Sequence, residues 1–160
     1  MNTIAVDKLM DETRRLASLY RQTTGQTLPI SAELARFDAA KHLNLQALSI
    51  PSKGIDFVGT LGPIQDKNIQ VKSRVIFNEK NSNYRLGQLN MELAWDIIIL
   101  VLYTELYQPY AMHGASKDTI LENHTTRGLI SLSKFKAISQ LLWTQESGVE
   151  WDEIWMRWWR

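Results

Sequence analysis

Residues 96–103 (DIIILVLY) are the feature that most constrains the fold of this chain, because every residue after the aspartate is apolar. A run of this length is far too short to span a bilayer. A strand with one face in water alternates apolar and polar residues, whereas a continuous apolar run is typical of a strand covered on both faces. The run therefore predicts a central strand between two layers, as in an α/β domain.

The composition fits one globular domain over residues 1–160. The chain has 44% hydrophobic and 22% charged residues, and 160 residues can bury one ordinary core. It has no cysteine, which excludes disulfides and thiolate metal sites and is natural in a reducing cytoplasm. Charges interrupt the first apolar stretch of the N-terminus, unlike in a signal peptide. We therefore expect a cytoplasmic protein with no membrane segment.

Hydrophobic periodicity predicts the order helix, three strands, helix, strand, with further elements at both ends. The first helix covers residues 6–23, and a second runs from Ser31, its expected N-cap, to residue 43. Pro109 places a later strand, 107–112, at a sheet edge. The other strands are expected at 45–49, 55–58 and 69–77, with a turn at 51–54, and the other helices at 84–93, 117–122, 133–143 and 150–160.

Gln70 and Lys72 lie on one face of the strand expected at 69–77. Side chains alternate along a strand, so these two stand about 7 Å apart on the same face. If strand 55–58 pairs with this strand as a hairpin, Asp56 meets that face at the strand ends. The pattern thus brings a carboxylate, an amide and an amine together.

Phosphodiester hydrolysis requires such a set of groups. Mg²⁺ takes hard oxygen ligands and keeps several waters. The Asp56 carboxylate supplies charge, while the amide oxygen of Gln70 and the main-chain carbonyl of Val71 can supply neutral ligands. The metal lowers the pKa of a bound water, and Lys72 can orient that water or neutralise the developing charge. We predict Mg²⁺ or Mn²⁺ as the cofactor.

The basic charge of the chain is concentrated around this site. The net charge is only +1, but residues 53–85 hold six Lys and Arg against three acidic residues. A polyanion would need its counter-charge there. Arg74, Lys53 and Arg85 are therefore candidate nucleic-acid contacts. For Arg74, phosphate binding and simple solvation of the strand are equally good interpretations.

The pattern Asp56…Gln70-x-Lys72 resembles the PD-(D/E)XK superfamily of nucleases. The match is to the variant in which glutamine replaces the second acid, as in Mrr-type restriction endonucleases, and Ile55 stands where the motif has proline. Residues 31 to about 136 are similar to a family of poorly characterised restriction-endonuclease-like proteins. The similar pieces are SAELARFDAAKHLNLQ, KGIDFVG, NIQVKSR, LAWDIIILVLY, YQPYAMHGAS and ISLSKFKA.

The resemblance implies a fold, a substrate and one more site residue. The fold is a restriction-endonuclease-like αβββαβ core, a central mixed sheet flanked by helices, here with extra N- and C-terminal helices. The substrate is nucleic acid, most simply DNA, and cleavage of both strands favours a homodimer because one site cuts one strand. In the superfamily an acid on the helix before the first strand often helps to bind metal, and Glu33 stands at the matching position. Taken alone, Glu33 is an acid in the first turn of a helix, which the helix dipole favours.

The helix expected at 150–160 carries a stripe of tryptophans. Trp151, Trp155, Trp158 and Trp159 recur at helical spacing. Docking on the domain's own core is the interpretation we favour. A homodimer interface through Trp151, Trp155 and Trp158 is the second, since Trp and Arg are enriched in interfaces, and base stacking is the third.

Two other functions remain open from the sequence. Alternating polar residues are usually the solvent face of a half-exposed strand, so Gln70 and Lys72 alone carry little weight. Because Gln70 removes one acid from the metal site, the alternative is a non-catalytic protein that keeps the nuclease fold as a module for binding nucleic acid or protein. A weaker alternative is an immunity or anti-restriction partner whose interface is the tryptophan helix.

Overall fold

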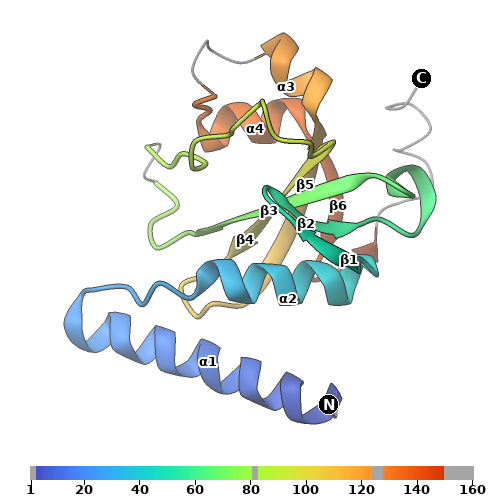
Figure 1. Cartoon of the computed structure of the whole chain (residues 1–160). Coiled ribbons are helices and arrows are strands. Elements are labelled where there is room, and N and C mark those ends of the chain that lie inside the picture. The colour runs from blue at the N-terminus through green and yellow to red at the C-terminus, as the bar shows by residue number, and fades with distance from the viewer. Residues whose placement is uncertain (1–2, 81–82, 124–127, 150–160) are drawn as a thin grey trace.

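A seven-stranded mixed sheet forms the centre of the computed structural model, which describes residues 3–80, 83–123 and 128–149 (Figure 1). The strands follow one another across the sheet in chain order. They are β1 (Gln46–Ser52), β2 (Ile55–Val58), β3 (Asn68–Val75), β4 (Ile97–Tyr103), β5 (Pro109–Ser116), β6 (Gln140–Thr144) and β7 (Gly148–Val149). The α/β class predicted from the sequence is therefore confirmed.

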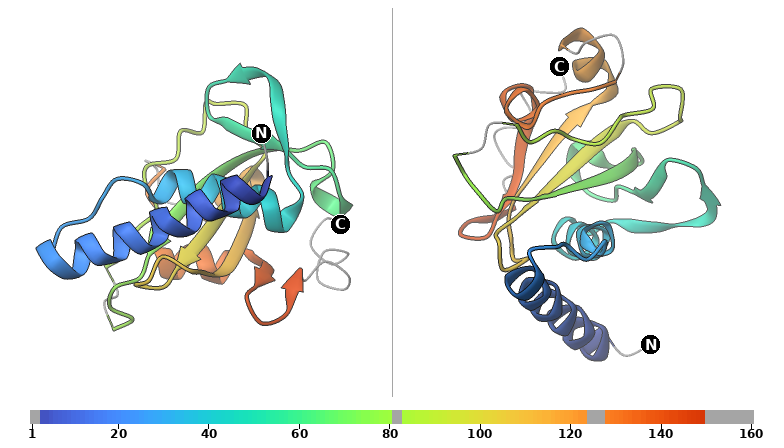
Figure 2. Two further views of the ribbon diagram at one scale, coloured as in Figure 1. Left: turned by 90° about the horizontal axis from the view of Figure 1, so that it is seen from below. Right: turned by 90° about the vertical axis from the view of Figure 1, so that its left-hand side faces the viewer.

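Helices cover both faces of this sheet. Four α-helices are formed by the described residues: α1 (Thr3–Thr24), α2 (Ser31–Leu43), α3 (Lys117–Asn123) and α4 (Leu132–Ile138), and a short 3₁₀ turn, η1 (Gly62–Ile64), joins β2 to β3. Helices α1 and α2 lie on one side of the sheet, and α3 and α4 lie on the other (Figures 1 and 2). None of the helices in the described ranges combines the length and the apolar character that crossing a membrane requires.

Strand β4 is the central strand, as its apolar run predicted. All seven of its residues are buried. It pairs in parallel with β3 and antiparallel with β5. Ile97 and Ile99 belong to a core shared with α2, whereas Ile98 and Leu100 belong to a second core shared with α3 and α4. The alternate residues of β4 thus hold one layer on each face.

Strands β1, β2 and β3 form an antiparallel meander ahead of the parallel pair. The strands predicted at 45–49, 55–58 and 69–77 are confirmed with small shifts of their ends. Lys53 and Gly54 alone make the first turn, since Pro51 and Ser52 still belong to β1. Gly54 has a φ of 80°, which glycine adopts without the steric cost of a side chain.

Residues 84–93 are not a helix, and this prediction was wrong. They belong to an irregular segment, residues 83–96, that leads from β3 towards β4 and buries Leu86 and Leu89 in the core on the α3–α4 side. The Leu86 N–H donates to the carbonyl of Ile130 at 3.1 Å, and the Leu89 N–H donates to that of Gly128 at 3.0 Å. These long-range hydrogen bonds satisfy backbone groups that a helix would pair locally.

The edge position predicted for residues 107–112 is also wrong, because β5 lies inside the sheet between β4 and β6. Pro109 is the first residue of β5, a position at which a strand tolerates proline. The helix predicted at 133–143 ends at Ile138, and residues 140–144 form β6 instead. The C-terminal helix predicted at 150–160, with its tryptophans, lies outside the described residues.

The helices predicted near the N-terminus and at 117–122 are confirmed as α1, α2 and α3. Ser31 is the first residue of α2 but not its N-cap, which is Ile30 without a side-chain cap. The Ser31 hydroxyl instead accepts a hydrogen bond from the hydroxyl of Ser73 on β3 at 3.3 Å. The start of α2 is therefore held by the sheet rather than by local capping.

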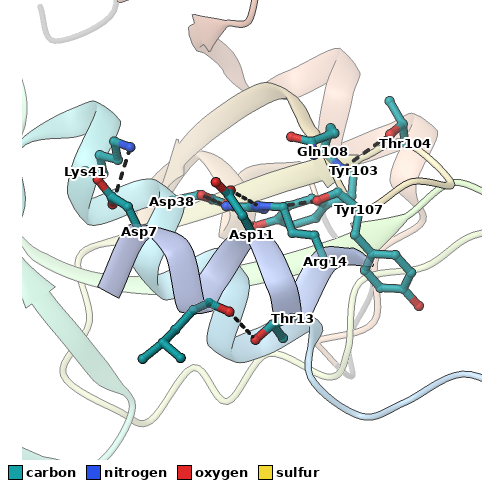
Figure 3. A network of polar contacts seen from close by, with 11 residues as sticks. Asp7, Asp11, Thr13, Arg14, Asp38, Lys41, Tyr103, Thr104, Tyr107 and Gln108 are labelled. Carbon is teal, nitrogen blue, oxygen red and sulfur yellow. Dashed lines mark hydrogen bonds and ion pairs between the residues drawn. The ribbon is translucent and has the colours of Figure 1, made fainter. Parts of the chain in front are cut away.

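A buried ion pair attaches α1 to the rest of the fold (Figure 3). Both terminal nitrogens of Arg14 donate to the carboxylate of Asp38 on α2, one of them at 2.7 Å, and Arg14 also donates to the Tyr107 carbonyl at 3.0 Å. The hydroxyl of Tyr103 donates to the same carboxylate at 2.6 Å. Arg14 is 5% exposed and Asp38 is 1% exposed, so water does not screen the pair. Burial and the neighbouring Asp38 raise the pKa of Tyr103, which keeps its hydroxyl a donor.

Candidate functional site at the junction of β2 and β3

The carboxylate of Asp56 lies against the backbone of β3, where the pairing of β2 with β3 ends. That pairing joins Phe57 to Ile69 and Val58 to Asn68. One residue further, Oδ2 of Asp56 accepts a hydrogen bond from the Val71 N–H at 2.8 Å. The side chain thus occupies a place that a main-chain carbonyl of β2 would take in a continued ladder. This bond uses Oδ2 only, so Oδ1 can serve a ligand.

Gln70, the residue before Val71 on β3, has an unsatisfied amide oxygen. Extended by one residue, the register that pairs Phe57 with Ile69 would set Gln70 opposite Asp56, and opposite residues of an antiparallel pair share a face. The Gln70 Nε2 group donates to the Gly54 carbonyl at 3.0 Å. Its Oε1 atom is buried and has no hydrogen-bond partner among the described residues. A buried acceptor without a partner costs about 1–3 kcal/mol, which a bound cation or water would offset.

The main-chain carbonyl of Val71 points towards the same side. In a strand, the N–H and the C=O of one residue face the same neighbour. Because the Val71 N–H bonds to Asp56 on β2, the Val71 carbonyl also faces β2. The Asp56 carboxylate and the Val71 backbone therefore meet at this junction, and Gln70 is the residue before Val71 on β3. That their oxygens hold a metal stays a prediction.

The ammonium group of Lys72 completes this set. Lys72 follows Gln70 on the same face of β3 and is half-buried. Burial lowers the pKa of Lys72, the Asp56 carboxylate acts in the opposite direction, and Arg74 adds to the lowering. A β-carbon built on Gly87 would lie 4.0 Å from Nζ, so the 83–96 segment forms the wall beside this amine. The amine thus lies within electrostatic reach of Asp56.

Glu33 is not brought to this junction by any contact that the described residues make. Its carboxylate pairs with Arg36 on its own helix, and its side chain is 66% exposed. Helix α2 packs on the face of the sheet that carries Ile69 and Val71, whereas Gln70 and Lys72 point to the other face. The role that the resemblance implied for Glu33 stays a prediction.

The three candidate nucleic-acid contacts have different surroundings. Lys53, in the β1–β2 turn, and Arg85 are exposed. Arg74 is half-buried, and its Nε donates to the main-chain carbonyl of Arg85 while Nη1 donates to that of Ser73 at 3.0 Å. Burial lowers the pKa of Arg74. Arg74 therefore holds the 83–96 segment on β3, a structural task that the sequence did not indicate.

Two groups at the junction were missed by sequence reasoning. The Gly54 carbonyl accepts a hydrogen bond from the Gln70 amide. Lys117 holds the 83–96 segment, because its Nζ donates to the carbonyls of Met91, at 3.2 Å, and of Leu93. The same Nζ lies 4.6 Å from the centre of the Trp95 ring. Gly54 carries a local signal, since a Lys-Gly pair between two apolar runs indicates a tight turn. Lys117 has no local sequence signal, because its hydrogen-bond partners are more than twenty residues away in the chain.

The oxygen set fits a hard divalent cation with few charged ligands. Within residues 3–80, 83–123 and 128–149, no three His, Cys, Asp or Glu side chains gather in a way that could hold a metal. The carboxylate that a hydrogen bond places on the backbone of β3 is that of Asp56, and Gln70, with its unpartnered oxygen, precedes Val71 on the same strand. Mg²⁺ tolerates this arrangement because it is often held by one or two carboxylates and keeps several waters.

Two hollows in the described surface lie away from these residues. One, of about 350 Å³, lies between α1 and the β4–β5 turn, with Arg15 and Leu106 in its lining. The other, of about 400 Å³, includes Phe77 and Glu105. Neither of these two hollows is lined by a candidate site residue. A polymer backbone, unlike a small molecule, does not require a deep cavity.

Comparison with protein-family models finds no match to this chain, and a search of curated proteins finds none either. The chemistry of the junction therefore has to be inferred from its residues.

Proposed function

We propose that this protein is a Mg²⁺- or Mn²⁺-dependent nuclease of restriction-endonuclease-like fold that hydrolyses phosphodiester bonds, most simply in DNA. The observation that carries the proposal is the buried, unpartnered Oε1 atom of Gln70. The N–H of the next residue, Val71, donates to the Asp56 carboxylate, and the Lys72 amine lies within electrostatic reach of that carboxylate. An acid, a neutral oxygen and an amine at one strand junction suit metal-assisted attack on phosphate.

The order of the strands supports the proposed fold. Helix α2 precedes the β1–β2–β3 meander, and β4 then pairs in parallel with β3. This is the order that an αβββαβ core requires, except that the 83–96 segment stands where that core has a helix. Arg74 and Lys117 hold this segment in place of helical packing.

The residues of the junction divide the chemistry between them. Asp56, Gln70 and the Val71 carbonyl would hold the metal, which when bound would act as a Lewis acid towards water and phosphate. Lys72 holds a proton at Nζ and can donate a hydrogen bond to the attacking water or to a phosphate oxygen. Since burial lowers its pKa, this amine gives up a proton more readily than an exposed lysine does. The exposed Lys53 and Arg85 would contact the phosphate backbone.

The alternative function is a non-catalytic member of the same fold that binds nucleic acid or a protein partner. The single carboxylate at the junction favours it, because Gln70 adds no charge to attract a cation. A thermal shift with Mg²⁺ or Mn²⁺ separates the two. The proposed nuclease gains stability from the metal and loses this gain in Asp56→Ala, whereas the non-catalytic protein shows no shift. A partner interface through Trp151, Trp155 and Trp158 would be tested by size exclusion with and without residues 150–160.

Cleavage of supercoiled plasmid with Mg²⁺ or Mn²⁺ tests the proposed activity. We expect nicking or linearisation by the wild type and a loss of about 100-fold or more in Lys72→Ala and in Asp56→Ala. Lys134→Ala is the matched control, because Lys134 is exposed on α4 on the same side of the sheet. Cleavage that survives both site substitutions would assign it to another centre or a contaminant. The absence of cleavage of DNA and RNA by a folded wild type would favour the non-catalytic alternative.

A further inference from the structure

The Gly54 carbonyl provides a reason for a glutamine, and not a second acid, at position 70. This inference rests on the proposed function, because it concerns how the junction would present oxygen to a metal. The Gln70 Nε2 group donates to the Gly54 carbonyl at 3.0 Å. A carbonyl can only accept, so the amide nitrogen must face it, and the amide oxygen must face the other way.

The position of that carbonyl is fixed from several sides. Gly54 adopts a φ of 80° in the β1–β2 turn, and a β-carbon on it would lie 2.5 Å from Cδ1 of Leu93. The turn and the 83–96 segment are therefore in tight contact. The Lys117 amine donates to the carbonyl of the same Leu93. The Gly54 carbonyl is thus a preorganised acceptor rather than a group that moves to suit its neighbour.

A glutamate at position 70 would meet this acceptor with a second acceptor. Both oxygens of a carboxylate lack a proton at neutral pH, so one of them would face the Gly54 carbonyl across a distance at which the amide now donates. Two acceptors in a half-buried place repel each other and leave both without a donor. The carboxylate would therefore turn away from the orientation that the amide has.

We propose that the Gly54 carbonyl is a positioning group that orients the Gln70 amide, aims Oε1 at the cation, and selects glutamine over glutamate at this position. The junction is then a site with one carboxylate, that of Asp56, because of its local architecture and not because a second acid has been lost. The substitution Gln70→Glu, which introduces a second acid, is therefore expected not to improve metal binding.

The first experiment follows the side-chain amide of Gln70 by NMR in the wild-type protein without metal. We expect its NH₂ protons to exchange with water at least tenfold more slowly than those of Gln26, which is exposed in the α1–α2 linker. Addition of Mn²⁺ should broaden the Gln70 side-chain signals and leave those of Gln26 sharp. Equal exchange rates for the two amides would overturn the proposal.

The second experiment compares Gln70→Glu with Gln26→Glu, which makes the same charge change on an exposed side chain. In EDTA we expect the unfolding midpoint of Gln70→Glu to fall by about 3–10 °C, against less than about 1 °C for the control. The Mn²⁺ concentration at half of the thermal shift should not decrease in Gln70→Glu. A stable Gln70→Glu protein that binds Mn²⁺ tenfold more tightly would refute the selection of glutamine.

The two experiments separate this inference from the proposed function. A protected Gln70 amide and an unstable Gln70→Glu variant, in a protein that neither binds metal nor cuts DNA, would keep the role of Gly54 in orienting the amide and reject the nuclease. Metal-dependent cleavage with a freely exchanging Gln70 amide would keep the nuclease and reject the role of Gly54.

Discussion

The carboxylate of Asp38 joins three parts of the chain that lie far apart in sequence. It accepts hydrogen bonds from Arg14 on α1 and from Tyr103 at the end of β4 (Figure 3). All three side chains are almost wholly buried. A charge in such a place is stabilised by its partners and not by water, so the loss of one partner leaves the other charge uncompensated.

Asp38→Asn should therefore destabilise the protein strongly. The amide keeps the size of the carboxylate but leaves the buried Arg14 guanidinium with only the exposed carboxylate of Asp11 as a counter-charge. We expect a loss of about 3–5 kcal/mol in the free energy of unfolding, measured by urea denaturation. Asp11→Asn is the matched control, since that side chain is 78% exposed and lies 3.8 Å from the same arginine. Equal effects of the two substitutions would show that the buried Arg14–Asp38 pair contributes no more to the free energy of unfolding than the exposed Arg14–Asp11 pair.

A half-buried histidine, His113 on β5, should make the fold sensitive to acid. Burial, with a smaller contribution from Lys136, lowers the pKa of His113 to about 4. The unfolded chain then binds more protons than the folded one between about pH 4 and 6.5, so stability is lost as the pH falls through this window. We expect up to about 3 kcal/mol of this loss to come from His113.

The measurement is the free energy of unfolding from pH 7 to pH 4 for the wild type and for His113→Gln. The variant should show a flatter curve. The variant's stability should still fall somewhat with pH, because burial also lowers the pKa of His42. The His42 ring stacks on the Trp143 ring, with 4.4 Å between the ring centres. An unchanged slope in His113→Gln would contradict the assignment.

At the residue scale, the sequence predicts contacts that a local pattern places and misses those that only the fold creates. Period two on β3 places Gln70 and Lys72 on one face, and the antiparallel pairing of β2 with β3 brings the Asp56 carboxylate to the Val71 N–H. The pair of Arg14 and Asp38 spans 24 residues and two helices, and no spacing in the sequence points to it.

At the scale of elements, the 83–96 segment shows where periodicity fails. Leu86 and Leu89 have helical spacing, and both are buried as a helix would bury them. Their backbone groups, however, bond to residues 128–130, about forty positions away. Conversely, β3 and β4 are predictable because alternation and a continuous apolar run decide strand type without reference to a partner.

Lys117 should control the order of this segment. Its amine donates to the carbonyls of Met91 and Leu93, so Lys117→Met removes both bonds while keeping an unbranched side chain. We expect backbone amides of residues 89–95 to exchange at least tenfold faster in hydrogen–deuterium exchange, with β4 unchanged. Lys134→Met, on the exposed side of α4, is the control. No change in the segment would show that apolar packing alone holds it.

At the scale of the whole molecule, one face of the sheet is covered by helices near the N-terminus and the other face carries the candidate site. The face that carries Ile69 and Val71 is closed by α2, with α1 outside it (Figure 2). The other face carries Gln70 and Lys72 at its β2–β3 end, beside the 83–96 segment. The α/β layering could be predicted from residues 96–103, but the seven-strand order could not, because β6 lies within a stretch that reads as a helix.

The link between Arg14 and Asp38 also sets the N-terminal limit of the folding unit. The resemblance places the core at residues 31–136, which would make α1 a dispensable extension. Without α1, however, the Asp38 carboxylate would lose the counter-charge of Arg14 and keep only the hydrogen bond from the Tyr103 hydroxyl. The buried ion pair thus gives α1 a structural role in the folding unit, although its residues take no part in the proposed chemistry.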